Sequence, residues 1–122
     1  MNIALWVVQG LLAIAFLMAG GMKATRPKEK LAENMAWVND FSAGTIRLIG
    51  ILEVLGAIGV VLPKLTGILP WLTPTAAVGL VLTMIGAALT HLRRGENSNI
   101  VMNAVLLVMA AFVAYGRFVV LP

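Results

Sequence analysis

Two ionisable residues, Glu53 and His91, stand in runs of the chain that are otherwise almost entirely apolar. An ionisable side chain inside a membrane helix costs about 2.5–3.5 kcal/mol even on the scale measured by insertion, so its presence needs a reason. A carboxyl group and an imidazole can hydrogen-bond to a bound molecule or exchange protons with it. Glu53 lies about eight residues into its run, roughly 12 Å along a helix, which is too deep for its short side chain to reach water.

Further polar residues are expected at the same end of a helical bundle. Lys23 ends the first apolar run, Arg47 begins the second, and Asn103 lies one turn into the last, while Met84 lies two turns before His91. Glycines three residues to either side of Glu53 would let another helix or a ligand approach closely. The predicted ligand-binding residues are therefore Lys23, Arg47, Glu53, Met84, His91 and Asn103. The alternative is a structural network in which Glu53 pairs with Arg47 or His91 and fixes the helix register.

Other kinds of site have little support in the sequence. The chain has no cysteine and a single histidine, so we expect no metal site. No phosphate-binding loop, dinucleotide fingerprint or nucleophile motif is present, which favours a non-enzymatic role for the isolated chain. The net charge of +4 comes from basic residues that lie mainly between apolar runs, where membrane topology explains them better than nucleic-acid binding does.

The composition requires lipid as the solvent for much of the chain. Hydrophobic residues make up 61% of the 122 residues and charged residues only 11%. A helix of about twenty residues crosses a hydrocarbon core of about 30 Å. We predict a single all-α domain over residues 1–122, a polytopic bundle of four transmembrane helices. The spans are expected at about 3–22, 45–62, 71–91 and 100–119, with the first an uncleaved helix because no basic segment precedes it.

The basic residues also predict an orientation in the cell (inner) membrane. Seven of the nine lie in, or at the edge of, the first and third connections: Lys23, Arg26, Lys28, Lys30, Arg47, Arg93 and Arg94. The opposite side has Lys64 and Arg117. We interpret Arg117 as a snorkelling anchor, whose long side chain reaches from the helix to the membrane surface. Because positive residues favour the cytoplasm, both termini should lie outside it.

The first connection, residues 23–44, is too long for a plain turn. Leu31, Met35, Val38 and Phe41 recur at steps of four and three and would form one face of a short amphipathic helix. We expect this helix to lie on the membrane surface. The alternative is a lid folded over the mouth of the bundle.

Several strings resemble the DoxX-like family of small four-helix membrane proteins. They are Ala-Gly-Gly-Met-Lys at 19–23, Arg-Leu-Ile-Gly-Ile-Leu-Glu-Val-Leu-Gly-Ala-Ile-Gly at 47–59, Pro63, His91 and Gly-Arg at 116–117. The second string is the most specific. The resemblance implies an association with quinone-linked oxidoreductases and oxidative-stress complexes, and distant relatives act in membrane-protein assembly. It also draws attention to Lys23, Arg47, Glu53 and His91.

Two functions follow as hypotheses. The first is a redox-associated accessory subunit that binds a lipophilic small molecule, with a quinone as candidate, in the cytoplasmic half of the bundle. The second is a non-catalytic scaffold or assembly factor for a protein complex. A proton-coupled transporter would need an oligomer, because four short spans offer little room for alternating access. Expected partners are membrane lipids, the lipophilic ligand, and either oxidoreductase subunits or further copies of the chain.

Overall fold

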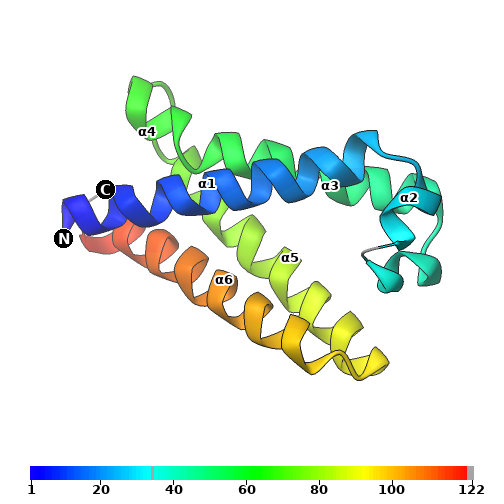
Figure 1. The fold of residues 1–122 in the computed structure, drawn as a ribbon. Coiled ribbons are helices and arrows are strands. Elements are labelled where there is room, and N and C mark those ends of the chain that lie inside the picture. The colour runs from blue at the N-terminus through cyan, green and yellow to red at the C-terminus, as the bar shows by residue number, and fades with distance from the viewer. Residues whose placement is uncertain (34, 121–122) are drawn as a thin grey trace.

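The computed structural model describes residues 1–33 and 35–120, and helices account for nearly all of them (Figure 1). The long helices are α1 (Asn2–Thr25), α3 (Ala43–Gly59), α5 (Leu72–Arg94) and α6 (Asn97–Tyr115). The short ones are α2 (Lys28–Ala32), the 3₁₀-helix η1 (Ala36–Asp40), α4 (Leu62–Thr66) and the π-helical turn η2 (Gly116–Val120). The all-α prediction is confirmed, and no strand occurs in the described ranges.

Four helical stretches are long and apolar enough to cross a membrane. They comprise Asn2–Thr25, Ala43–Thr66, Leu72–Arg94 and Asn97–Val120, with mean hydropathies between 1.8 and 2.2. Only 28% of the most apolar window of each is buried inside the protein, so most of these side chains face outward. Outward-facing apolar side chains are stable only in lipid. The prediction of a membrane protein with four transmembrane helices is confirmed.

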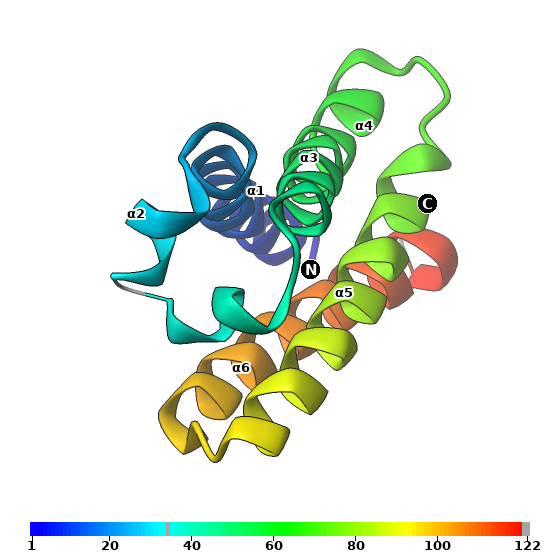
Figure 2. The same cartoon turned by 90° about the vertical axis from the view of Figure 1, so that its right-hand side faces the viewer.

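The long helices form two antiparallel pairs, α1 with α3 and α5 with α6 (Figure 1). The pairs meet near Asn2 and η2, which we call the terminal end of the bundle. They diverge toward α2, η1 and the turn between α5 and α6, which we call the connection end (Figure 2). The wedge between the pairs therefore widens toward the connection end.

A glycine crossing holds α1 against α3. A Cβ atom added to Gly50 would lie 2.5 Å from the backbone nitrogen of Ala24, and one added to Gly20 would lie 2.7 Å from the carbonyl oxygen of Gly50. Real Cβ atoms do not come this close to backbone, so only glycine permits the contact. Close backbone approach through small residues is a common way to pack membrane helices. Here it brings Lys23, near the end of α1, beside α3.

The main apolar core draws on all four long helices. Its buried members are Leu12, Phe16, Ala57, Val60, Ala77, Leu80, Met84, Ala110, Val113 and Ala114. A smaller cluster at the connection end consists of Leu31, Val38 and Ile46, from α2, η1 and α3. The main core holds the two helix pairs together, and the smaller cluster holds the first connection against α3.

The first connection differs from the single surface helix that we expected. It contains two short helical segments, since α2 ends at Ala32 and η1 begins at Ala36. Leu31 and Val38 do share an apolar side, but they are buried against Ile46 of the bundle. Burial against protein removes these side chains from water as effectively as a membrane surface would. The structure therefore agrees with the lid alternative.

Arg117 also differs from expectation, because its side chain is buried and does not snorkel. Its Nε donates to Gln9 Oε1 at 2.8 Å, and its Nη1 donates to Asn2 Oδ1 at 2.9 Å. Gln9 in turn donates to the carbonyl oxygen of Val60 at 2.7 Å. The guanidinium carbon lies 5.1 Å from the centre of the Trp6 ring. Acceptors inside the bundle thus bind Arg117 and tie α1, α3 and η2 together at the terminal end.

Candidate functional site

A cavity of about 570 Å³ lies between the two helix pairs toward the connection end. Small-molecule sites have volumes of roughly 300–1,000 Å³. Its apolar walls come mainly from α3, α5 and η1, and its polar groups come from all four long helices and the turn that follows α5. The polar residues are Lys23, Glu53, Thr83, Thr90, His91, Glu96, Asn99 and Asn103. An apolar cavity with a few polar groups is typical of a ligand site.

Glu53 is buried in this cavity wall and paired with Lys23. The Glu53 side chain is only about 1% exposed, and its Oε1 lies 2.7 Å from Lys23 Nζ. The same ammonium group lies 5.3 Å from the centre of the Trp37 ring, within range of a cation–π contact. Lys23 thus connects α1 with both α3 and η1. The structural alternative named Arg47 or His91 as the partner of Glu53, whereas the structure gives Lys23.

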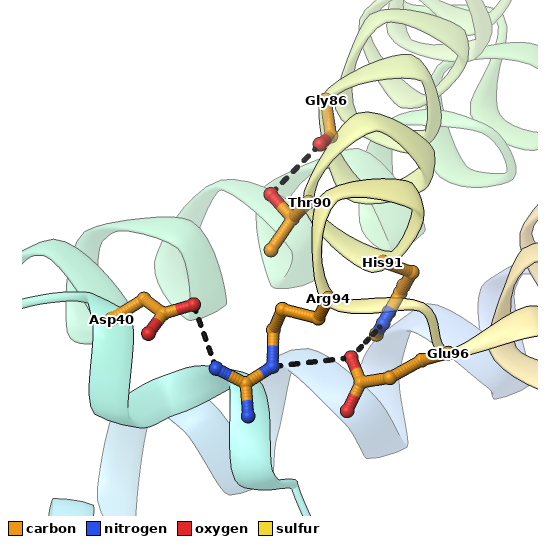
Figure 3. Close-up of polar contacts among 6 residues, drawn as sticks. All are labelled: Asp40, Gly86, Thr90, His91, Arg94 and Glu96. Atoms are coloured by element: carbon orange, nitrogen blue, oxygen red, sulfur yellow. Dashed lines mark hydrogen bonds and ion pairs between the residues drawn. The ribbon is translucent and has the colours of Figure 1, made fainter.

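A chain of polar contacts connects the edge of the cavity to the first connection (Figure 3). His91 Nδ1 lies 2.8 Å from Glu96 Oε1, and Arg94 Nε lies 3.4 Å from the same oxygen. Arg94 Nη1 donates to Asp40 Oδ2 at 2.8 Å, which joins the end of α5 to η1. The hydrogen bond with His91 and the positive charge of Arg94 hold the pKa of the Glu96 carboxyl below its usual value.

Asn103 carries the clearest sign of a missing binding partner. Its side chain is 8% exposed and lines the cavity, and its Nδ2 has no hydrogen-bond partner within the part of the chain that the structure describes. Leaving a buried donor unpaired costs about 1–3 kcal/mol, and most such groups in native proteins are paired. The amide is therefore placed to donate to an oxygen of a bound molecule.

The structure brings five of the six predicted ligand-binding residues together. Those that line the cavity are Lys23, Glu53, Met84, His91 and Asn103. Arg47 does not, because its side chain is exposed on α3 while its neighbours Ile46 and Gly50 face the protein interior. We therefore leave Arg47 out of the site. That the other five bind a ligand stays a prediction.

Sequence reasoning missed the groups that come from the connections. Trp37 and Phe41 line the cavity and contact each other edge to face, with ring centres 5.7 Å apart. The Trp37 ring lies 6.3 Å from that of His91. Glu96 was missed because it lies outside the apolar runs, although it follows His91 by five residues. The turn at Gly95, with φ of 72°, lets the chain reverse so that Glu96 reaches the imidazole.

Comparison with known proteins places the chain in one family. No curated protein and no solved structure matches the sequence. The sequence profile of the DoxX-like family matches residues 7–113, a range that covers most of the chain and all five cavity residues that the sequence predicted. The chain therefore belongs to the DoxX-like family.

Proposed function

We propose that the protein binds a lipophilic small molecule in this cavity and acts as a membrane-bound accessory subunit of a redox system. The molecule has an uncharged head group with oxygen acceptors, and a quinone is the candidate. The observation that carries the proposal is the buried Nδ2 of Asn103, which lines the cavity without a hydrogen-bond partner among the described residues. A carbonyl oxygen of a ligand would satisfy that donor.

The charges around the cavity support an uncharged head group. Lys23 is paired with Glu53, and Arg94 is paired with Asp40 and lies near Glu96. A ligand with a net charge would need a counter-charge, and burying a charge without one is expensive. Because these ionic groups already have partners, a neutral ligand fits better than an anion or a cation.

The shape and chemistry of the walls support a flat or aromatic head group. Trp37 and Phe41 cover one side of the cavity, and Met84 and Leu52 contribute flexible apolar surface. Aromatic rings favour stacked or edge-to-face contacts with other ring systems. A quinone ring with carbonyl oxygens combines such a surface with the acceptors that Asn103 requires.

The redox part of the proposal is supported by the family. The family resemblance implies an association with quinone-linked oxidoreductases, and Glu53 and His91 both line the cavity. Both side chains can form hydrogen bonds that help to bind a quinone or exchange protons with it. We assign no electron-transfer step to this chain, and the oxidoreductase partner would perform the reaction.

Mass spectrometry of lipids that co-purify with the protein tests this function. The protein is extracted from its native membrane in mild detergent, beside the Asn103→Leu variant and the control Met102→Leu. Met102 is the neighbour of Asn103 and is 59% exposed on the outside of α6. We expect a quinone-like molecule with the wild type and the control and several-fold less with Asn103→Leu. A protein that retains only phospholipid, together with a stoichiometric protein partner, would support the scaffold alternative.

A further inference from the structure

We infer that the ligand is a bilayer-resident molecule whose apolar chain leaves the cavity sideways, between α3 and α5, into the lipid. The opening lies beside Leu52 of α3 and Leu82 and Gly86 of α5, because these three residues line the cavity and are also exposed on the outside of the bundle. The inference rests on the proposed function and adds two points to it. The ligand enters the cavity from the bilayer, and its apolar chain contributes to binding. A head group alone would occupy only the polar part of the site.

The lining of the cavity is uneven around the bundle. Helix α1 contributes Lys23 alone, and α6 contributes only Asn99 and Asn103. The apolar lining from the long helices comes instead from α3 and α5: Ile49, Leu52, Leu82, Met84, Gly86 and Ala87. An apolar chain would therefore lie along the boundary between α3 and α5, while the polar groups of α1 and α6 face it from the other side.

The cavity reaches the outer surface of the bundle at this boundary. Leu52 is 53% exposed and Leu82 is 64% exposed, although both line the cavity. They belong to stretches that cross the membrane, so the surface outside them is lipid. Leu52 is the sequence neighbour of Glu53, which places the opening close to the depth of the buried carboxylate.

Helices α3 and α5 pack closely on one side of this opening. Toward the terminal end, a Cβ atom added to Gly56 would lie 2.7 Å from a methyl carbon of Leu80, and one added to Gly59 would lie 2.7 Å from Cβ of Ala76. These glycines let α3 and α5 pack tightly there. Beyond them the helix pairs diverge, in the half of the bundle whose residues line the cavity (Figure 1).

The first connection covers the cavity on the other side of this opening, toward the connection end. Trp37 and Phe41 of this segment line the cavity at the connection end. The ion pair between Asp40 and Arg94 attaches the segment to α5 (Figure 3). The contact between the Trp37 and His91 rings attaches it a second time. A molecule dissolved in the bilayer meets an apolar opening, whereas one in water meets this aromatic and charged cover. Access from the bilayer is the route that the structure favours.

Gly86 offers a precise way to obstruct the opening. It lines the cavity, and no atom lies within 4 Å of the position where its Cβ would stand, so a larger side chain there begins in open space. Gly79 is the matched control. It lies seven residues earlier on α5, turned by about 20° on the helix surface, is equally free of neighbours and does not line the cavity.

The test uses Trp37 as a fluorescent reporter in the cavity. The chain has three tryptophans, and replacing Trp6 and Trp71 by phenylalanine leaves Trp37 alone. Quinones quench indole fluorescence on contact. The probes are a decyl-substituted benzoquinone and the same ring without the decyl chain, titrated into detergent-solubilised protein with concentrations expressed per mole of detergent. The variants Gly86→Leu and Gly79→Leu are made in this Trp37-only background.

We expect Gly86→Leu to weaken binding of the decyl probe by about tenfold, the effect of losing contact with roughly two methylene groups. Binding of the chain-free ring should change less, by about twofold or under. Gly79→Leu should alter neither. Equal weakening of both probes, or no weakening of either, would overturn the lateral chain while leaving the proposed function intact. If neither probe quenches Trp37 in the background protein, the proposed function itself fails.

Discussion

Lys23 Nζ lies 2.7 Å from Glu53 Oε1, so the end of α1 and the middle of α3 are joined by an ion pair with a nearly inaccessible carboxylate. The glycine crossing of Gly20 and Gly50 makes this contact possible, because it removes the side chains that would hold the two backbones apart. The pair also forms part of the cavity wall. Helix packing and the polar site are therefore coupled through the same few residues.

Replacing Glu53 by glutamine should destabilise the bundle. The change leaves the Lys23 ammonium without its anion in a largely buried position, which costs roughly 3–5 kcal/mol when a buried pair is broken. Thermal unfolding in detergent measures the loss. The double variant Lys23→Met, Glu53→Leu is the control and should be close to wild type, because it removes both charges together. A Glu53→Gln protein as stable as wild type would show that the ion pair contributes little.

Replacing Gly50 by alanine should separate α1 from α3. The new methyl group would overlap the backbone at Ala24, and overpacking of this kind costs about 1–3 kcal/mol or more when backbone must move. Gly21→Ala is the matched control, since nothing lies within 4 Å of its Cβ position. It should be neutral or more stable by about 0.5–1 kcal/mol, the usual gain for this change inside a helix. Equal unfolding temperatures for the two variants would contradict the glycine crossing.

The contacts of Glu96 predict a dependence of stability on acid pH. The pKa of Glu96 is lower in the folded protein than its ordinary value of 4.5, so the unfolded chain binds the proton more readily. The stabilisation is present above pH 4.5 and is lost as the pH falls below it, through the pKa of the folded state. Unfolding temperatures measured from neutral to acid pH should decline more for wild type than for Glu96→Gln. Parallel curves would mean that the contacts with His91 and Arg94 do not stabilise the fold.

The orientation predicted from the basic residues can be tested with single cysteines, because the chain has none of its own. Both Asn97, the first residue of α6, and Ile68, between α4 and α5, are exposed, and they lie at opposite ends of the bundle. A membrane-impermeant thiol reagent applied to intact cells should label Ile68→Cys and leave Asn97→Cys unlabelled until the cells are opened. The reverse pattern would refute the assignment of both termini to the outside.

Much of the fold could be predicted because its signals are local. Long apolar runs specify membrane helices, and the cost of burying charge makes Glu53 conspicuous within its run. The partner of Glu53 could not be predicted in this way. Lys23, Arg47 and His91 are all near enough along their helices, and the choice among them depends on helix rotation and on the glycine crossing, which brings one lysine within reach.

Contacts between segments far apart in the sequence also could not be predicted from local sequence patterns. Arg117 resembles a residue at a membrane edge, and nothing near it in the chain reveals that Gln9 and Asn2 lie beside it. Trp37 likewise lies outside the apolar series Leu31, Met35, Val38 and Phe41, on which the prediction for the first connection rests. Its position over the cavity depends on burial of Val38 against Ile46. Such contacts depend on how the helix pairs assemble.

The proposed ligand site is tested most directly by the affinity of the Trp37-only protein for the decyl benzoquinone. This affinity is compared with that of the Asn103→Leu variant of the same protein. Removing one well-placed neutral hydrogen bond weakens binding by about fivefold to tenfold. We predict a loss of this size for Asn103→Leu and none for the neighbouring control Met102→Leu, with unchanged unfolding temperatures for the control. Equal dissociation constants for Asn103→Leu and its parent would contradict the assignment of the unpaired amide to a bound ligand.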